Sequence, residues 1–506
     1  MNLGILEILS LTFTPLNILI SFIGVVLGIA VGALPGFTAS MGIAVLIPIT
    51  WGMDPVPALL LLSALYCGAM YGGSIPAILL RTPGLPTDFL TAMEGYEMAK
   101  QGRGGEALNE AAIASFWGGM AGSLALLLLA PPLARAALRF GPQENFMLAV
   151  FGLSIIASLV GQSMLKGIIS GMFGLLVGTV GIAPFVGQPR YTFGVIELFT
   201  GIPLVPALIG VFSLAQVFTF VGGDSSQILD KAAIKVERAK FKLKEMIGFP
   251  LVYLRGSIIG IIVGVIPGPG ASIATFISYN SAKNASKNPE LFGKGSREAV
   301  ASADVANSAI AGGGMVPMLT LGIPGSAVTA VLLGGLMIQG LMPGHTLFTE
   351  RADVVYPFIV GRFIAQFFVL FIGICAARYF VKLVKAPVHM LAVVIVVATV
   401  LGSYAITISL VNVYIMLVFG VFGFLMKRFG FEPAPLVLGM ILGPIAETGL
   451  QQALALSRAH GEHILVNMFT RPISIVLLLL TILSLVGPTL RERRRARKKA
   501  AQAAVE

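Results

Sequence analysis

Four short segments centred on Pro-Gly pairs are the part of this sequence best suited to chemistry. Proline removes a backbone donor and glycine permits left-handed geometry, so each pair is expected to end a helix. If a new helix starts within a membrane, its first N–H groups lack partners and its dipole presents a positive end, which together favour an anion. The residues expected to bind an anionic substrate at these breaks, including nearby hydroxyls and one arginine, are Pro35, Gly36, Thr38, Ser40, Arg81, Thr82, Pro83, Gly84, Pro267, Gly268, Gly270, Ser272, Pro324, Gly325 and Ser326.

Few charged side chains lie near the breaks. Arg81 immediately precedes one of them, where its guanidinium either pairs with a carboxylate in fork geometry or is an ordinary interfacial arginine. Asp304 and Asn307 lie one turn apart on an expected helix, where they either coordinate a coupling cation or bond a neighbouring helix. Glu447 is a weaker candidate of the same kind. The charged segment 84–106 is expected to form a solvated surface loop or an interfacial helix, with Asp88, Glu94, Glu97, Lys100 and Arg103.

The elements that must position these residues are membrane-spanning helices. Of 506 residues, 56% are hydrophobic and only 11% are charged, and the mean hydropathy is +0.92. A soluble domain carries about 25% charged residues, so this chain has too little polar surface to face water. Apolar runs such as 15–34, 55–80 and 202–221 approach the ~20 residues that cross a bilayer. The sequence predicts an all-α polytopic membrane protein with broken or re-entrant helices and about 12 membrane segments.

An internal repeat relates the two halves of the chain. Two ordered blocks recur at nearly the same offset, which favours a duplication over chance. The first three glycines of the first block are expected to form a helix-packing seam in each half. In the first block, the residues that recur 232 positions later are Gly24, Gly28, Gly32, Pro35, Gly36, Ala39 and Ser40. In the second block, the residues that recur 241 positions later are Gly72, Gly73, Pro76, Pro83 and Gly84.

The distribution of positive charge orients the halves. No Lys or Arg occurs in residues 1–15, whereas seven occur in residues 231–255. By the positive-inside rule the two blocks start on opposite sides of the membrane, as in an inverted repeat. The basic runs flank apolar spans, which favours cytoplasmic anchoring over nucleic-acid binding. The expected organisation is a first membrane repeat (1–222), a basic cytoplasmic linker (223–247), a second membrane repeat (248–490) and a basic cytoplasmic tail (491–506).

Signatures of catalysis are absent from the sequence. His460 and His463 have the wrong spacing for a metalloprotease pair on one helix face, and the segment 268–270 lacks the lysine of a phosphate-binding loop. No nucleophile elbow occurs in a suitable strand context. We therefore expect neither an enzyme nor a bound cofactor or metal.

Several motifs together resemble the large membrane subunit of the tripartite tricarboxylate transporters (the TctA family). The resemblance runs from about residue 15 to residue 490. The motifs that carry it are Gly32-Ala-Leu-Pro-Gly36, Gly68-Ala-Met-Tyr-Gly-Gly-Ser74, Thr82-Pro-Gly84, Arg190-Tyr-Thr-Phe-Gly194, Gly264-Val-Ile-Pro-Gly-Pro-Gly270, Leu321-Gly-Ile-Pro-Gly-Ser326, Gly420-Val-Phe-Gly423 and Leu442-Gly-Pro-Ile-Ala-Glu447.

The resemblance implies a function and a set of partners. Such subunits import di- or tricarboxylates across the bacterial inner membrane, with a small TctB-like membrane subunit and a TctC-like periplasmic solute-binding protein. They are driven by a sodium or proton gradient rather than by ATP, and analogy with other inverted-repeat transporters suggests an elevator-like movement. This chain departs from the family at Asp304, where Pro-Glu is usual before the paired asparagines, and at Arg81, where asparagine is common. Arg81 is therefore the leading candidate for substrate specificity.

Two other classes compete with ion-coupled carboxylate import. An anion channel requires charged rings or filter carbonyls along its pore, and the chain has few charges for rings. A membrane-embedded enzyme requires a reactive constellation, which the sequence lacks. Duplicated helix breaks favour the transporter, because symmetric breaks can converge on one site near the bilayer midplane.

Overall fold

The computed structural model describes residues 4–34, 36–82, 84–159, 164–185, 187–222, 241–266, 271–384, 388–459 and 471–484. Most of the predicted linker and the whole predicted tail lie outside these residues, as do Pro35, Pro83, Pro267, Gly268 and Gly270. The chain divides into two compact units, the first formed by Met1–Ala137 and Val205–Phe424, the second by Leu138–Leu204 and Leu425–Glu506. Each unit combines segments from both of the predicted halves.

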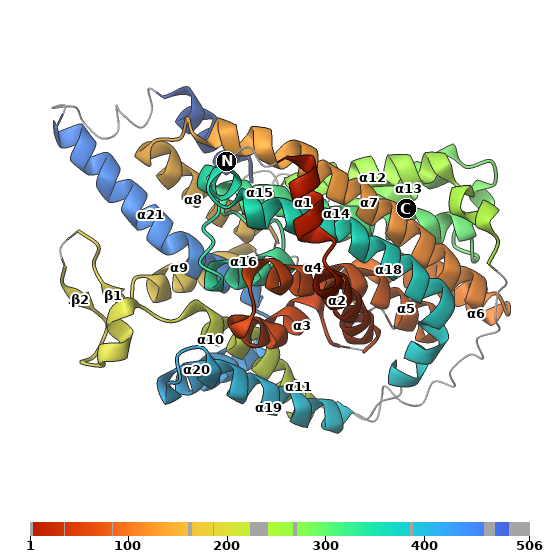
Figure 1. Ribbon diagram of the computed structural model, residues 1–506, viewed down its shortest axis with the longest axis horizontal. Helices are drawn as coiled ribbons and strands as arrows, with labels where there is room; N and C mark the ends of the chain where they lie inside the picture. The colour runs from red at the N-terminus through yellow and green to blue at the C-terminus, as the bar shows by residue number, and fades with distance from the viewer. Residues whose placement is uncertain are drawn as a thin grey trace, which may run out of the picture. The chain divides into compact units, whose positions relative to one another are not determined.

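The first unit is a bundle of helices that contains all four predicted breaks (Figure 1). The chain passes between the units at the end of α7, near the start of α10 and near the end of α20. The helices are α1 (Ile5–Thr12), α2 (Pro15–Ala33), α3 (Ala39–Leu46), α4 (Pro55–Gly72), α5 (Ser74–Leu80), α6 (Phe89–Lys100), α7 (Gly104–Ala137), α10 (Leu204–Leu208), α11 (Ala215–Gly222), α12 (Pro250–Val265), α13 (Ala271–Ala285), α14 (Arg297–Gly313), α15 (Met315–Leu321), α16 (Ala327–Ile338), α17 (His345–Thr349), α18 (Ala352–Val384), α19 (Val388–Ala405) and α20 (Leu410–Arg428). Short turns of 3₁₀ helix are Ile47–Gly52, Pro86–Asp88, Leu243–Ile247 and Pro289–Leu291, and Ile209–Leu214 is a π-helix.

The second unit is smaller. Its helix α21 packs against α8 and α9. Its elements are α8 (Pro142–Leu159), α9 (Met164–Gly178), β1 (Gly181–Ile182), β2 (Pro189–Arg190), the 3₁₀ turn Ile196–Thr200, α21 (Pro433–Ala459) and the helix Pro472–Ser484. The two short strands pair antiparallel, with Gly181 opposite Arg190, and they are the only departure from helix among the described elements.

Seven helices of the described chain are long and apolar enough to cross a membrane. They are accompanied by shorter apolar helices such as Pro250–Val265 and Ala327–Ile338. The expectation of a mainly helical, multi-pass membrane protein is confirmed, while the count of about 12 segments stays a prediction. The span Pro55–Leu80, which contains α4 and α5, is buried from Pro57 to Leu79.

Glycines bring two pairs of helices into backbone contact. Helix α2 packs along α4 so closely that a Cβ on Gly28 would collide with the Leu65 carbonyl oxygen. Helix α12 packs along α14 in the same way, and a Cβ on Gly260 would lie 2.6 Å from the Ala306 carbonyl oxygen. The predicted glycine seam is thus confirmed in both halves, since small residues let helix backbones approach.

Helices end at all four Pro-Gly segments. Helix α2 ends at Ala33, and α3 begins after Thr38, whose hydroxyl accepts a hydrogen bond from the Met41 amide at 3.4 Å. In the second half α12 ends at Val265 and α13 begins at Ala271. The other two segments follow the ends of α5 and α15, as expected for residues that interrupt helical hydrogen bonding.

The charged segment 84–106 is not a solvated loop. It forms α6, on which Glu97 and Lys100 are partly exposed, but Asp88 and Glu94 are fully buried. Glu94 accepts hydrogen bonds from the Gly295 and Ser296 amides at 3.0 and 3.1 Å, at the start of α14. The expectation of surface exposure was wrong for these two acids because their partners come from the other half of the chain.

The glycine seam makes a prediction about stability. Replacement of Gly28 by Ala should lower the free energy of unfolding by roughly 1–3 kcal/mol, because the added methyl overpacks a backbone contact. The matched replacement Gly52→Ala places its Cβ in open space and should change stability by less than about 0.5 kcal/mol. Thermal unfolding of the two purified variants in detergent measures the difference. Equal melting temperatures would contradict the close approach of α2 and α4.

Candidate functional site

Three glycines meet where the broken helices of each half come together. A Cβ on Gly84 would lie 2.7 Å from Gly73 Cα and 2.8 Å from the Gly32 carbonyl oxygen. We call Gly32, Gly73 and Gly84 the first junction. Every member belongs to a different helix or to the segment that follows it, so the junction is the place where three interrupted elements touch.

The second junction repeats this geometry with the corresponding glycines. A Cβ on Gly325 would lie 2.9 Å from the Gly264 carbonyl oxygen and 3.1 Å from Gly314 Cα. Gly264, Gly314 and Gly325 are the residues that the internal repeat relates to the first junction. The first junction therefore needs three residues without side chains, whereas at the second the need is clear for Gly264 and Gly325, because a Cβ on Gly314 would lie 3.3 Å from its nearest neighbour, the Ile310 carbonyl oxygen.

The segment after each junction is capped in the same manner. The Leu85 amide donates to Asp88 Oδ2 at 2.8 Å, and the Ser326 amide donates to Thr329 Oγ1 at 2.8 Å. Leu85 and Asp88 correspond to Ser326 and Thr329 at the offset of 241 residues. The first half thus has a buried carboxylate where the second half has a hydroxyl.

That carboxylate belongs to a buried polar cluster at the first junction, formed by Asp88, Asp304 and Asn307. Asp88 lies directly on Gly73, where any side chain would displace it, and it accepts a hydrogen bond from Asn307 Nδ2 at 3.1 Å. Asp304 Oδ1 accepts from Ser74 Oγ at 2.8 Å and from Thr91 Oγ1 at 3.1 Å. The structure therefore brings together the predicted pair, Asp304 and Asn307, at the break between α4 and α5.

The cluster has acceptors that lack partners. Asp304 Oδ2 and Asn307 Oδ1 are buried without a hydrogen-bond donor, and the hydroxyl oxygen of Ser308 is also unpartnered. Asp304 lies one turn before Asn307, the hydrogen-bond partner of Asp88, and no described Lys, Arg or His forms an ion pair with either carboxylate. Two neighbouring carboxylates cannot both stay ionised in a dry interior without a compensating positive charge. A proton or a bound cation is therefore needed here.

The donor set of this cluster suits a hard cation or a proton. Carboxylate, amide and hydroxyl oxygens are ligands for cations that prefer oxygen, and they are not a zinc or copper set. Within the described ranges no group of three or more His, Cys, Asp or Glu residues has the spacing of a metal site.

The predicted substrate-binding residues lie in several environments. Thr38 Oγ1 and Ser40 Oγ are 2.9 Å apart at the start of α3, and Ser326 caps α16. Arg81 ends α5 in a left-handed conformation, and its guanidinium lies over the Tyr96 ring at 5.8 Å from the centroid. Because Arg81 is exposed, its position suits a contact at the end of the helix rather than in the buried centre.

The remaining predicted residues lie close to these. The Thr82 hydroxyl is directed to the Pro76 carbonyl at 3.5 Å, and Ser272 belongs to the first turn of α13. Gly36 has positive φ and faces the Phe220 ring, and Pro324 is buried next to the second junction.

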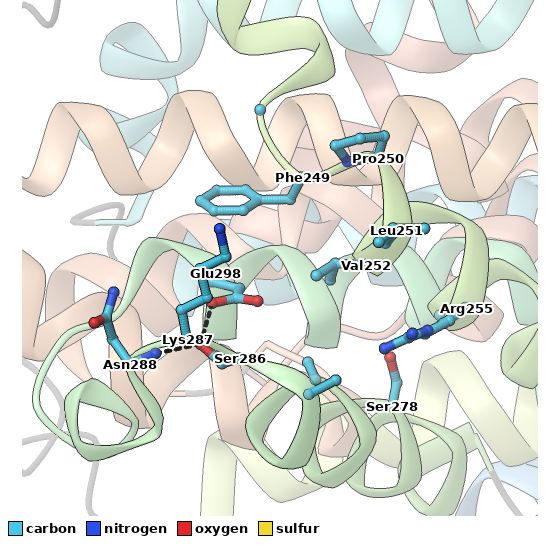
Figure 2. A pocket seen from close by; sticks show the side chains of 14 residues that line it. Phe249, Pro250, Leu251, Val252, Arg255, Ser278, Ser286, Lys287, Asn288 and Glu298 are labelled. Carbon is cyan, nitrogen blue, oxygen red and sulfur yellow. Dashed lines mark hydrogen bonds between the residues drawn. The ribbon is translucent and has the colours of Figure 1, made fainter.

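A pocket of about 430 Å³ opens beside α12 and α13 but contains none of these residues (Figure 2). Figure 2 shows Arg255 beside Ser278, and Lys287 and Asn288 near Glu298. Glu298 accepts a hydrogen bond from Ser286 Oγ at 2.6 Å. Because Glu298 lines the pocket together with Arg255 and Lys287, the pocket has charges of both signs.

Glu447 has a partner. Arg190 Nη1 and Nη2 donate to its two carboxylate oxygens at 2.8 and 2.9 Å within the second unit. This bidentate ion pair joins two of the sequence motifs. It explains the presence of a carboxylate at Glu447 without a role in ion coupling.

Asp88 is the site residue that sequence reasoning missed. The charged residues that follow it, three on α6 and Arg103 after the helix, suggested a solvent-exposed surface. The signal that identifies it is its position three residues after Leu85, where an acid caps the first turn, combined with its correspondence to Thr329.

Comparison with known proteins identifies the family of this chain. Residues 18–438 match the model of the tripartite tricarboxylate transporter TctA family, and the chain belongs to that family. It is therefore a membrane component of a transporter, and the family is one of transporters rather than enzymes.

Two relatives come from Agrobacterium vitis. An uncharacterized 52.8 kDa protein in the TAR-I ttuC′ 3′ region is 40% identical over 482 residues, which cover 95% of each chain. An uncharacterized protein in the TAR-II ttuC′ 3′ region is 35% identical over 235 residues, which cover 46% of this chain and 97% of that protein. No solved structure matches.

The exposed position of Arg81 defines a test of its role. Arg81→Ala removes only a cation–π contact worth about 0.5–1 kcal/mol, so membrane abundance should hardly change. If Arg81 contacts substrate during transport, uptake of the cognate acid should fall far more than abundance does. Uptake and immunoblotting of the same membranes measure both quantities. Equal loss of uptake and abundance would exclude a specificity role.

Proposed function

We propose that this chain is the large membrane subunit of a cation symporter that imports a di- or tricarboxylate or a related organic acid. In this proposal it works in the bacterial inner membrane with a small membrane subunit and a periplasmic solute-binding protein. Membership of the TctA family supports the assignment. The observation that carries it is the pair of matched glycine junctions, one of which holds two buried acids that lack a counter-charge.

The cluster at the first junction is the coupling site in this proposal. Asp88 and Asp304 need one positive charge to be stable together, and the unpartnered oxygens of Asp304 and Asn307 offer ligands for it. Sodium or a proton fulfils this need, and interrupted helices are where secondary transporters hold such ions. The site is therefore filled or emptied according to the gradient across the membrane.

The two halves form an inverted repeat in this proposal. Matching junctions and caps at offsets of 232 and 241 residues support a duplication. Residues 231–255, which precede the second block, contain seven basic residues, and residues 1–15, which precede the first block, contain none; this difference supports opposite orientations. Opposed halves let a carrier open to either side by moving one half against the other.

Reconstitution tests the function directly. Proteoliposomes that contain all three components should accumulate a member of a carboxylate panel, including citrate and succinate, only when a sodium or proton gradient is imposed. Saturable uptake that follows one gradient is the expected result. Uptake that does not saturate and ignores both gradients would indicate a channel and contradict symport.

Neutralising the acids tests the coupling site. Asp304→Asn and Asp88→Asn should each weaken gradient-driven uptake by about 10–100-fold, because a charged ligand contributes about 1.5–3 kcal/mol. Neither change should lower abundance, since each removes a buried like charge. Glu97→Gln, at the partly exposed Lys100 pair of α6, is the matched control and should leave uptake unchanged.

The dependence of uptake on cation concentration decides whether the two acids form the coupling site. The half-saturating concentration of sodium, or the pH at half-maximal uptake, should shift in both variants and not in the control. Unchanged cation dependence in Asp304→Asn and Asp88→Asn would show that coupling lies elsewhere.

A further inference from the structure

Arg362 is a buried cation at the middle of a membrane span. It lies on α18, about 4 Å along the helix axis from the midpoint of the span Ala352–Ala377 at 1.5 Å per residue. Its side chain is 1% exposed and is the largest of the fully buried ones in the described chain. A charged residue at this depth is costly and marks a functional site more often than a packing site.

The guanidinium is poorly satisfied by the protein. Nη1 donates to Ser63 Oγ at 3.4 Å and to Met315 Sδ at 3.2 Å, which are weak contacts. Nε and Nη2 are buried without an acceptor, and no carboxylate among the described residues forms an ion pair with Arg362. An arginine that merely ties helices together would use these donors on carbonyl or carboxylate oxygens.

The missing partner must carry negative charge. Arginine cannot lose its proton in a protein, so burial does not neutralise it as it can neutralise lysine. An internal water would accept a hydrogen bond but would leave the charge uncompensated. The donors Nε and Nη2 lie in the plane of one guanidinium fork, which matches the two oxygens of a carboxylate.

Other polar groups converge on the same place. Tyr66 interacts with the charge of Arg362 and with the side chain of Ser326, the cap of α16. Met315 directly follows Gly314, a member of the second junction. Through its contact with Met315 the guanidinium therefore lies close to the second junction, and the Ser63 hydroxyl borders it.

The internal repeat relates this place to the acidic cluster. At the offset of 241 residues, Ser63 corresponds to Asp304 and Tyr66 corresponds to Asn307. Met315, which contacts the guanidinium, corresponds to Ser74, which donates to Asp304. Equivalent positions thus border a negative site at the first junction and a positive site at the second.

We propose that Arg362, with Ser63, Tyr66 and Ser326, forms the binding site for a carboxylate group of the transported anion. The inference rests on the proposed function and adds the residue that recognises the substrate. Carboxylate oxygens accept from Nε and Nη2, while the hydroxyls of Ser63, Tyr66 and Ser326 bind the remaining polar atoms of the acid. The Pro-Gly segment before Ser326 brings the helix end to this site.

Direct binding tests the proposal without relying on transport. Citrate and succinate are the probes, and neutral trimethyl citrate is the control ligand, each added to the purified chain in detergent. At least one acid should raise the melting temperature of the wild type, whereas the ester should not. Arg362→Gln should weaken the binding of that acid roughly 30-fold or more, as expected when a buried charged partner is lost. Arg362→Lys retains the charge but loses the guanidinium fork, so its affinity for the acid should lie between those of the wild type and Arg362→Gln.

A matched variant and a second readout separate binding from folding. Arg351 immediately precedes α18, and its side chain is 42% exposed. The Arg351→Gln variant should therefore leave acid binding unchanged. Without ligand, Arg362→Met should melt no earlier than the wild type, because an unpaired buried charge is removed. A structural arginine would instead make Arg362→Met clearly less stable.

The outcomes for the site and for the proposed function are distinguishable. If the wild type binds no acid, or if Arg362→Gln binds the acid as tightly as the wild type, the proposed site is wrong. If binding depends on Arg362 but reconstituted vesicles show no gradient-driven uptake, the site stands and symport fails. If uptake is gradient-driven and its KM is unaffected by Arg362→Gln, symport stands and the site fails.

Discussion

Backbone contact between helices without side chains is the constraint on which the rest of this structure depends. At the glycine seams the carbonyl oxygens of α4 and α14 lie where the Cβ atoms of α2 and α12 would be. Helices that pack this closely bring their interrupted ends to the same point, so Gly84 and Gly325 can each touch two other backbones. Interrupted helices are stable at membrane depth only where protein or a polar cavity surrounds them, and the junctions provide that setting.

The two junctions share a backbone plan and differ in charge. In the first, Asp88 and Asp304 form an acidic cluster that requires a cation or a proton. In the second, Arg362 occupies a related place and requires an anion. A cation and a carboxylate bound at these places would each lower the cost of the other's charge, and such coupling is reciprocal by thermodynamic necessity. A duplicated scaffold with opposite charges would be a simple physical basis for the proposed symport.

The sequence predicted the backbone features better than the buried charges. Glycine spacing and Pro-Gly pairs act locally, so the seams and the helix ends could be predicted without a structure. Asp304 and Asn307 were found because a polar turn within an apolar span is conspicuous. Asp88 was missed because its burial depends on Asn307, which is 219 residues away in the chain.

Arg362 was missed for a related reason. It lies in an apolar span but adjoins no Pro-Gly motif, and only the contacts with Ser63 and Met315 reveal that its charge lacks a partner. Arg81 attracted attention because it adjoins a Pro-Gly motif, yet it lies exposed over Tyr96. Position next to a motif is therefore a weaker guide than unmet hydrogen-bonding capacity inside the folded chain.

An experimental density map of the chain in lipid nanodiscs, with and without a bound carboxylate, tests the central claim most directly. The account predicts density for the acid within hydrogen-bond distance of the Arg362 fork, beside the second junction, and an acidic cluster enclosed by protein at the first. A map in which Arg362 bonds backbone carbonyls while the acid lies elsewhere would contradict it. So would a map in which α2 and α4 are held apart by lipid.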